Sequence, residues 1–227
     1  VTQGTVFLKN LKRVSEYFKK HIPGFDFFCY FHAQVSTVEE GHQLYDDSVA
    51  RDAKGEYCFY SSRCLKMYVP TLTNKYGKAL WEYVKLIVDK DKLDMHMYWD
   101  EESYSIHRFV YNDQAWDGHS IILNPRTFEV ARKVTCVPLA TQPLKLAITK
   151  YVKDSGKLLL ANSQAATPTM RAQKIIRFVE TGSYDNVYKS NLGCIIGLGT
   201  HGFENTPAGT FEQFQQMLLR GGIQYSD

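Results

Sequence analysis

The alternation of strand-like and helix-like segments is the feature that most constrains the fold of this chain. Short apolar runs, rich in β-branched and aromatic residues, repeatedly precede amphipathic segments with helical spacing. Parallel strands need a crossover, usually a helix, so this order predicts an α/β fold with a parallel sheet. The expected strands are residues 25–34, 93–99, 157–161, 175–179, 194–198 and 223–225.

Helices are expected between these strands. Gly156, for example, is a helix stop directly before the strand at 157–161. A long loop follows the first strand, and an irregular insertion follows the second as far as Arg132. The expected helices lie at 7–21, after Asn74, and at 144–153, 169–173 and 210–219.

Six strand–helix units predict most of a TIM-type (β/α)8 barrel. A complete barrel takes about 250 residues, whereas this chain has 227, so we expect the opening strands to lie upstream. Composition does not change abruptly along the chain, and no flexible linker interrupts it. We therefore expect one barrel domain over residues 1–227 that belongs to a larger protein.

Composition excludes two classes of partner. The chain is 44% hydrophobic with a net charge of +3, which predicts a globular domain with a substantial core. The cationic stretch at 9–20 carries apolar residues at helical spacing, so we interpret it as a solvated helix face rather than a nucleic-acid site. No apolar run is long enough to span a bilayer. We expect neither nucleic-acid binding nor a membrane span.

Cysteine and histidine spacing bears on metal binding and location. The chain has no Cys-x-x-Cys pair, and its histidines have no metal-ligand spacing, so we expect no metal. Cys58 and Cys64 flank a short loop that a disulfide would close outside the cell. The alternative is ordinary buried thiols, which strand-like surroundings favour for Cys29 and Cys194. The predicted location is extracellular or the cell surface.

Polar residues end several of the apolar strands, at the carboxyl end where barrel enzymes place their active sites. The run at 95–102 ends in three acids, and the run at 174–180 ends in one. Two other expected strands lead to His32 and Asn162. An apolar strand with a polar tip is hard to explain by stability alone, so we expect these tips to line one functional site.

The acids at these tips predict hydrolysis of a glycosidic bond. One carboxyl group protonates the leaving oxygen while the other attacks the sugar or activates water. We expect Glu180 to be one partner and Asp100 or Glu101 the other, with their roles left open. Because side chains alternate along a strand, Asp100 and Glu101 are expected on opposite faces. The alternative is that the acids after Trp99 cap the next segment or pair with Arg108, and that Glu180 is a solvated turn residue.

Aromatic, amide and imidazole side chains near the tips suit a carbohydrate cleft, because sugar rings stack on aromatic faces while their hydroxyls find polar groups. The predicted substrate-binding residues are His32, Tyr98, Trp99, Trp116, Asp117, His119, Asn162 and His201. The alternative is that the aromatic residues pack in the core or the insertion, and that His119 and His201 are structural.

The stretch 197–202 matches the dinucleotide pattern G-x-G-x-x-G after a strand. That pattern needs a helix that opens at the glycines, whereas residues 203–207 intervene here. We therefore expect no cofactor, and we interpret the glycines as a tight barrel loop with His201 at its tip. A phosphate- or nucleotide-dependent enzyme is the least favoured alternative.

Several motifs occur in an order that resembles glycoside-hydrolase-like (β/α)8 barrels, over most of the chain after residue 25. They are Tyr30-Phe31-His32, the loop 46–60 with Lys54-Gly55, Pro70 with Asn74-Lys75-Tyr76-Gly77, Tyr98-Trp99-Asp100-Glu101, Trp116-Asp117-Gly118-His119-Ser120, Ala161-Asn162-Ser163-Gln164, Phe178-Val179-Glu180-Thr181-Gly182 and Ile196-Gly197-Leu198-Gly199. The resemblance implies a carbohydrate-active barrel with a glycan as partner. Its acids after two strands correspond to Asp100, Glu101 and Glu180.

The predicted function is hydrolysis of a glycan. The alternative belongs to a different functional class. In it, the chain is a non-catalytic barrel module of an extracellular or surface assembly and binds glycan or neighbouring protein subunits through its aromatic loops. An open cleft with paired acids favours hydrolysis. Acids locked in salt bridges, or a cleft filled by residues 102–132, favour the module.

Overall fold

The computed structural model describes residues 2–104, 106–180, 196–199, 206–219 and 223–225. In this part of the chain the main sheet has the strands β1 (Phe28–His32), β4 (His96–Asp100), β9 (Leu159–Asn162), β10 (Ile176–Glu180), β11 (Ile196–Gly199) and β12 (Ile223–Tyr225). The longer helices are α1 (Thr2–His21), α3 (Lys75–Val88), α4 (Val137–Asp154) and α7 (Pro207–Leu219). The shorter elements are α2 (Gly41–Leu44), η1 (Asp46–Ser48), η2 (Asp113–Ala115), α5 (Pro168–Arg171), β2 (Val35–Ser36), β3 (Lys66–Met67), β5 (Phe109–Val110), β6 (Ile121–Leu123), β7 (Val130–Lys133) and β8 (Thr135–Cys136).

The predicted alternation of strands and helices is confirmed, although several bounds move. The strand expected at 25–34 is shorter and comprises β1 only. The aromatic rings directly before it pack against α1. Phe25 stacks on Phe18 with ring centroids 5.2 Å apart, and Phe27 meets Phe18 edge to face at 5.7 Å.

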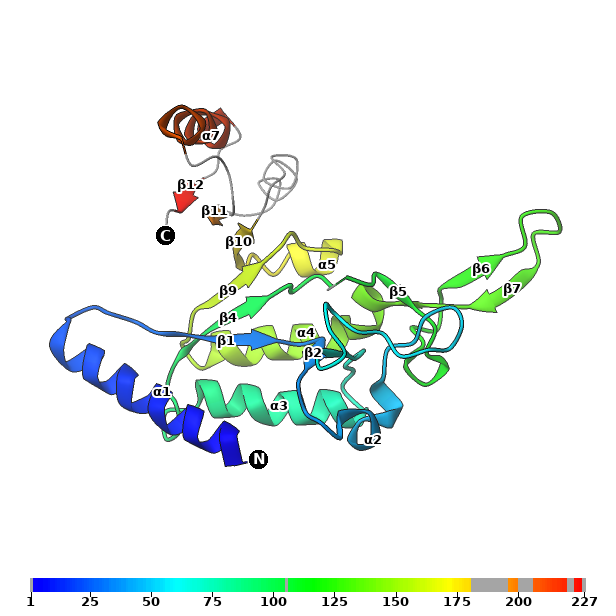
Figure 1. Cartoon of the computed structure of the whole chain (residues 1–227), viewed down its shortest axis with the longest axis horizontal. Helices are drawn as coiled ribbons and strands as arrows, with labels where there is room; N and C mark the ends of the chain where they lie inside the picture. The colour runs from blue at the N-terminus through cyan, green and yellow to red at the C-terminus, as the bar shows by residue number, and fades with distance from the viewer. Residues whose placement is uncertain (1, 105, 181–195, 200–205, 220–222, 226–227) are drawn as a thin grey trace.

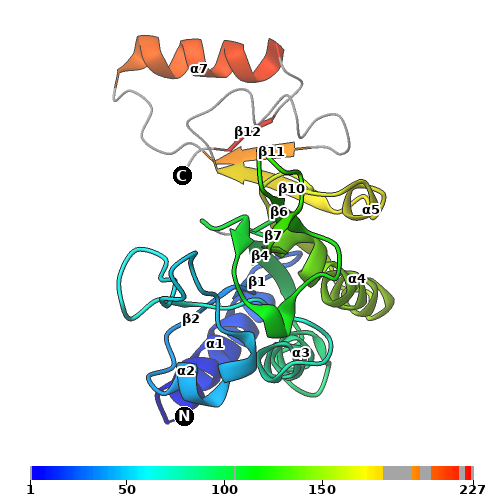
Figure 2. The ribbon, with the colours of Figure 1, turned by 90° about the vertical axis from the view of Figure 1, so that its right-hand side faces the viewer.

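The main sheet is parallel throughout, and each strand lies beside the next one along the chain, in the order β1-β4-β9-β10-β11-β12. A doubly wound sheet reverses its strand order at a switch point, whereas a barrel does not. The observed order therefore lacks the switch point of a doubly wound sheet. The described strands form one open row and do not by themselves close a barrel (Figure 2).

The register brings the carboxyl ends of the strands to one edge of the sheet, which we call the carboxyl edge. His32 of β1 lies opposite Asp100 of β4, and Asn162 of β9 lies opposite Phe178 of β10. Glu180 is the last residue of β10 and therefore lies at the same edge. Parallel pairing thus gathers the polar strand tips from distant parts of the chain.

Helices α3 and α4 cover one face of the sheet (Figure 1). The side chains that point to this face are buried, as in Phe31 and Met97, and they meet Ile87 of α3 and Ile148 of α4. Alternation along the strands sends every second apolar residue into this core. The helices therefore account for one face of the sheet only.

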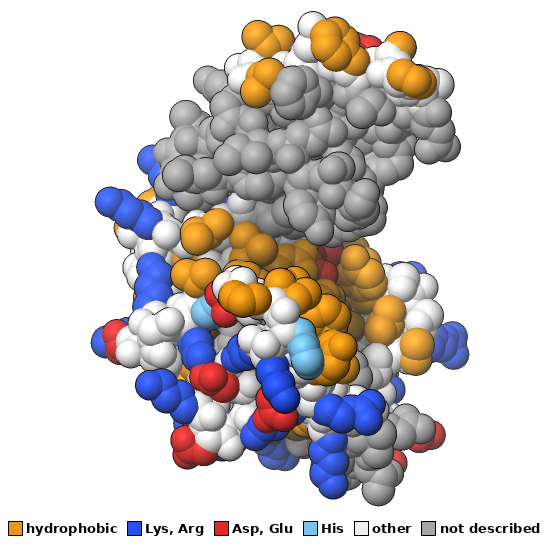
Figure 3. All heavy atoms as spheres, turned by 90° about the vertical axis from the view of Figure 1, so that its left-hand side faces the viewer, with side chains coloured by type: hydrophobic (Ala, Val, Ile, Leu, Met, Phe, Trp, Pro, Cys, Tyr) orange, Lys and Arg blue, Asp and Glu red, His pale blue; other side chains and the backbone are white. Residues whose placement is uncertain are grey.

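The other face of the sheet, which we call the open face, carries large side chains that remain accessible. Tyr30 of β1 is 55% exposed and Ile176 of β10 is 50% exposed, and Phe28 is exposed as well. Figure 3 shows hydrophobic side chains gathered on the side of the molecule where the strands begin. In a closed barrel the same positions would point into the packed interior.

The start of α3 depends on Asn74, which caps the helix. Its side-chain oxygen accepts the Gly77 N–H at 2.9 Å, and its amide donates to the Val69 carbonyl at 2.8 Å. Gly77 has no side chain because its backbone approaches the Thr71 carbonyl, where an added Cβ would lie only 1.7 Å from the oxygen. The helix predicted after Asn74 is therefore confirmed together with its cap.

Helix α4 begins earlier than the predicted residue 144. Pro143 lies inside the helix, and an internal proline normally indicates a helix boundary. The helix nevertheless runs through Pro143 and extends back to Val137, with Pro138 in its first turn. The insertion before it is also more regular than expected, because β6 and β7 form a hairpin that projects from the body (Figure 1).

The described cysteines are all free thiols, so the Cys58–Cys64 disulfide considered from the spacing is wrong. Cys58 is buried, and that burial raises the pKa of its thiol to about 11, whereas Cys64 is exposed. Cys29 is buried as expected, and Cys194 lies outside the described residues. None of the described helices is long and apolar enough to cross a membrane.

Candidate active site at the carboxyl edge

Asp100 ends β4 on the open face, and protein donors surround its carboxylate. The Tyr30 hydroxyl donates to Oδ2 at 2.7 Å, and the Asn162 side-chain amide donates to Oδ1 at 2.7 Å. The Tyr98 hydroxyl at 3.3 Å and the Glu101 N–H at 3.0 Å also donate to Oδ1. Burial and the hydrogen bond to Asp100 raise the pKa of Tyr30, so its hydroxyl keeps the proton that it donates. Three adjacent strands thus orient one carboxylate.

Glu101 follows in a left-handed turn with φ of 46°, and this turn decides where its carboxylate lies. Oε2 lies 3.2 Å from Nε2 of His32, and the Tyr60 hydroxyl donates to Oε1 at 3.0 Å. The Gln34 N–H donates to Nδ1 of His32 at 3.1 Å, which assigns the ring proton to Nε2, facing Glu101. The prediction that Asp100 and Glu101 point to opposite faces is wrong, because the turn ends the alternation.

Glu102 lies in a different environment, fully buried on the helix side. Its Oε2 is 2.8 Å from Nη1 of Arg177, and its Oε1 is 3.7 Å from Nζ of Lys145, although neither approach is a well-directed hydrogen bond. The alternative that Glu102 pairs with Arg108 is therefore wrong. Burial lowers the pKa of Lys145, and the nearby Glu102 carboxylate offsets part of that shift. Removing one member of such a buried pair typically costs about 3–5 kcal/mol.

Sequence reasoning missed this buried cluster, although the sequence carries a signal for it. Arg177 stands within the apolar run of β10, and a charge in a buried strand requires a partner. Lys145 likewise stands beside Leu144 on the buried side of α4. The partner itself, Glu102, is distant in the sequence and is identified only by the fold.

Two predicted substrate-binding residues on β4 have contrasting positions. Tyr98 faces the open side and donates to Asp100, and its ring meets that of Tyr30 with centroids 5.8 Å apart. Trp99 is 1% exposed and packs edge to face on Phe31 at 5.2 Å in the helix-side core. Trp99 therefore presents no surface to a sugar, as the alternative of core packing anticipates.

Trp116, Asp117 and His119 belong to the insertion, and their contacts are with the insertion and with β8 directly after it. The Trp116 indole donates to the Ser120 carbonyl at 2.8 Å. Asp117 accepts the N–H groups of His119 at 2.8 Å, Ser120 at 2.7 Å and Cys136 at 2.8 Å. Partial burial raises the pKa of Asp117, but these hydrogen bonds outweigh burial and hold the pKa below its usual value. The observed role of Asp117 is to hold a turn.

Other predicted residues are described only in part. The backbone of Glu180 belongs to β10, but its side chain lies outside the described residues, as does the whole of His201. The glycine stretch at 197–202 begins in β11, and α7 begins only at Pro207. The glycines are thus separated from the helix in the chain, as the argument against a dinucleotide site requires.

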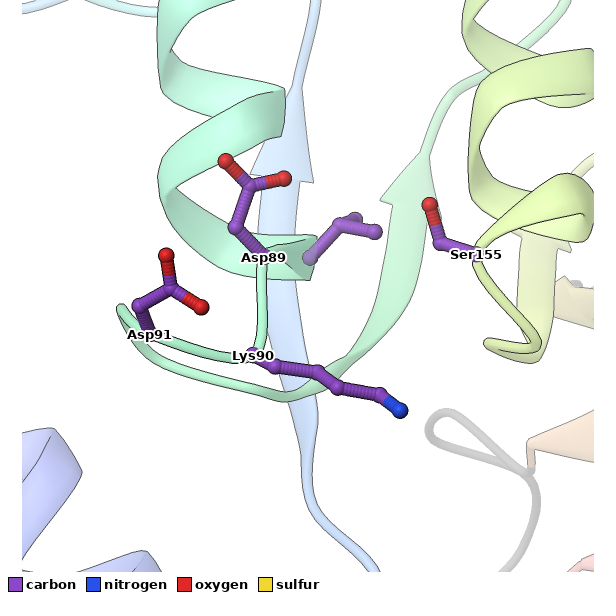
Figure 4. Close-up of a pocket in the computed structure, with 5 residues that line it drawn as sticks. Asp89, Lys90, Asp91 and Ser155 are labelled. Carbon is purple, nitrogen blue, oxygen red and sulfur yellow. The ribbon is translucent and has the colours of Figure 1, made fainter.

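A cavity of about 330 Å³ lies at the opposite edge of the sheet, where α3 and α4 end and the strands begin (Figure 4). Its lining residues are Val88, Asp89, Lys90, Asp91 and Ser155. Active sites of parallel α/β folds lie at the other edge, so we assign this cavity no part in the candidate site. Among the described residues, no group of three or more His, Cys, Asp or Glu side chains is placed to hold a metal ion.

No family model matches this chain, and no curated protein matches its sequence. Solved structures resemble it. The cycloalternan-degrading enzyme from Trueperella pyogenes has a TM-score of 0.51 and 11% identity, over 96% of this chain and 32% of its own. A Kfla1895 mutant in complex with cyclobis-(1->6)-alpha-nigerosyl has a TM-score of 0.51 and 9% identity, over 96% of this chain and 31% of its own.

At these identities the likeness concerns the fold alone. This chain spans about a third of the length of each of these structures.

Proposed function

We propose that this chain forms part of a glycoside-hydrolase-like (β/α)8 barrel that hydrolyses a glycosidic bond with paired carboxylates. The observation that carries the proposal is the position of Asp100 and Glu101, two consecutive acids at the carboxyl edge that face groups from neighbouring strands. Barrel enzymes build their sites at this edge. The structural neighbours, one named for degrading a glycan and one in complex with a saccharide, support a carbohydrate-active role.

The proposal includes closure of the barrel by strands beyond the 227 residues. The monotonic strand order supports it, because it is the order of a barrel. The large half-exposed side chains of the open face support it as well, since further strands would bury Tyr30 and Ile176 in a barrel interior. The one-domain assignment of residues 1–227 and the extracellular or cell-surface location stay predictions.

The chemistry needs two carboxyl groups with different roles. Asp100 is held rigidly by Tyr30 and Asn162, which suits a group that must meet a sugar in one orientation. Glu180 ends a strand at the same edge and is the proposed second partner. A separation of about 5–5.5 Å would give retention of configuration, and about 6.5–9.5 Å would give inversion.

The test is a digestion screen of the full-length protein against a glycan panel that includes cycloalternan. We expect Asp100→Asn and Glu180→Gln each to lower the rate by about 10²–10⁴, the range of a lost acid or base, without loss of folding by circular dichroism. Glu82→Gln, on the exposed side of α3, is the matched control and leaves the rate unchanged. A variant that keeps the wild-type rate removes its residue from the mechanism.

A second candidate is a non-catalytic barrel module that binds glycan or protein subunits. One observation favours it: both oxygens of Asp100 and both oxygens of Glu101 already face protein hydrogen-bonding groups. Calorimetric binding of a glycan that the wild-type protein never cleaves would select this candidate. Cleavage that is lost in Asp100→Asn would reject it.

A further inference from the structure

Three ionisable side chains meet in the interior directly beneath the carboxyl edge. Glu102 follows β4, Arg177 belongs to β10 and Lys145 belongs to α4. Their exposed fractions are 0%, 2% and 2%, so none of the three is solvated. We call this group the buried ionic cluster. Replacing such a cluster by apolar residues is often neutral or stabilising, so its presence is not explained by stability.

The cluster holds the backbone of two loops at once. Nη1 of Arg177 lies 2.8 Å from Oε2 of Glu102 and donates to the Ser163 carbonyl at 2.8 Å. Nζ of Lys145 donates to the Ser103 carbonyl at 2.6 Å. Residues 101–103 leave β4 and residue 163 leaves β9, so the cluster joins the exits of two neighbouring strands.

Both exits contain a strained residue. Glu101 has φ of 46° and Ser163 has φ of 79°, the left-handed region that favours glycine. Residues in such conformations persist only where the surrounding structure over-determines them. The loops are also joined directly, since the Glu102 N–H donates to the Asn162 carbonyl at 3.2 Å and the hydroxyls of Ser103 and Ser163 lie 2.7 Å apart.

The strained turns decide where the candidate catalytic groups lie. The turn at Glu101 directs its carboxylate to His32, and the turn at Ser163 directly follows Asn162, the donor to Asp100. A side chain that fixes both turns therefore acts on both acids without touching a substrate.

We propose that Arg177 and Glu102 are positioning residues, whose buried ion pair holds the left-handed turns at Glu101 and Ser163 and thereby sets the geometry of Asp100 and Glu101. The inference rests on the proposed function for its catalytic meaning. Its structural content, the control of the two turns, is testable without any substrate.

The first test is hydrogen exchange of the full-length protein with Arg177→Lys. Lysine keeps the charge, but a single ammonium does not span Glu102 and the Ser163 carbonyl as the planar guanidinium does. We expect exchange at residues 101–102 to rise about tenfold or more while residues 84–88 of α3 change little. Glu102→Gln, which keeps the size of the side chain, gives the same selective rise if Arg177→Lys does not fold. A parallel rise in both segments, or no rise at 101–102 in a folded variant, overturns the inference.

The second test is a rescue by glycine. In the Arg177→Lys background, Ser163→Gly supplies the left-handed conformation without strain but removes the hydroxyl that meets Ser103. Ser163→Ala removes the same hydroxyl and is the reference, against which we expect slower exchange at residues 101–102 and recovery of part of the lost glycan turnover. The matched control is Lys174→Gly, which relaxes a left-handed residue with φ of 50° just before β10 and restores neither. Equal rescue by the two glycines indicates a general gain in stability and overturns the inference. A rise in exchange confined to residues 101–102 of the variant supports the positioning role even if the wild-type protein cleaves no glycan. That combination of results rejects the proposed hydrolysis.

Discussion

Three consecutive acids at the end of β4 have three different environments, which shows how much one backbone turn decides at the level of single residues. Asp100 continues the strand and meets donors on the open face. Glu101 adopts φ of 46°, at a cost of about 1–2 kcal/mol for a residue with a side chain, and reaches His32. Glu102 then enters the core and pairs with Arg177. The proposed chemistry at this edge depends on that turn as much as on the acids.

At the residue scale, Asp117 gives a pH prediction. Its hydrogen bonds hold the pKa below the usual value of 3.8, so its contribution to stability is present above pH 4 and is lost as the pH falls through the folded-state pKa. We expect Asp117→Asn to lower the melting temperature clearly at pH 7 and progressively less towards pH 3. Asp113→Asn, at an exposed neighbouring position, is the control. Its difference in melting temperature from the wild type should not shrink as the pH falls. An Asp117→Asn deficit that stays constant with pH would contradict the assignment.

Among the elements, α3 illustrates how local sequence and tertiary contact combine. Its start is encoded by Asn74, and its buried face by apolar residues at helical spacing such as Leu80, Val84 and Ile87. Its close seating against the preceding loop needs the missing side chain of Gly77. The helix cap, the apolar face and the close backbone contact at Gly77 together hold α3 in place.

We expect Asn74→Ala to destabilise the protein by about 1–2 kcal/mol, the upper range for a lost helix cap, because the Gly77 and Thr71 N–H groups lose their acceptor. Thr73→Ala, one residue earlier and exposed, is the control and should change stability little. Chemical denaturation measures the difference in unfolding free energy between variant and wild type, provided that the denaturant dependence (the m value) is unchanged. Equal midpoints for the two variants would remove Asn74 as the cap of α3.

For the whole molecule, the open sheet has one covered face and one accessible face. Parallel sheets are normally covered on both faces, and barrels achieve this by turning one face inward. The exposed Tyr30 and Ile176 are therefore the residues that report whether further strands close over this face.

Hydroxyl-radical footprinting of the full-length protein measures this closure. If the proposed barrel closes, Tyr30 should be labelled several-fold more slowly than Tyr17 of α1, which is 60% exposed. Tyr17 serves as the internal standard, because it is the same residue type as Tyr30 and similarly exposed. Equal labelling of Tyr30 and Tyr17 would contradict barrel closure.

The sequence by itself determined the order of strands and helices, the parallel sheet and the polar tips at Asp100 and Asn162, because these depend on local periodicity and on the short-range rules of strand connection. It also determined the capping of α3 by Asn74. These features need only residues that are near one another in the chain.

The tertiary structure alone decided which groups face one another. Three of these contacts involve residues that are far apart in sequence. They are the contact of Glu101 with His32, the packing of Trp99 in the core and the ion pair of Glu102 with Arg177. Pairing energies across such distances depend on geometry and burial, which a linear pattern does not contain. The acids were therefore predictable as residues, and their environments only from the fold.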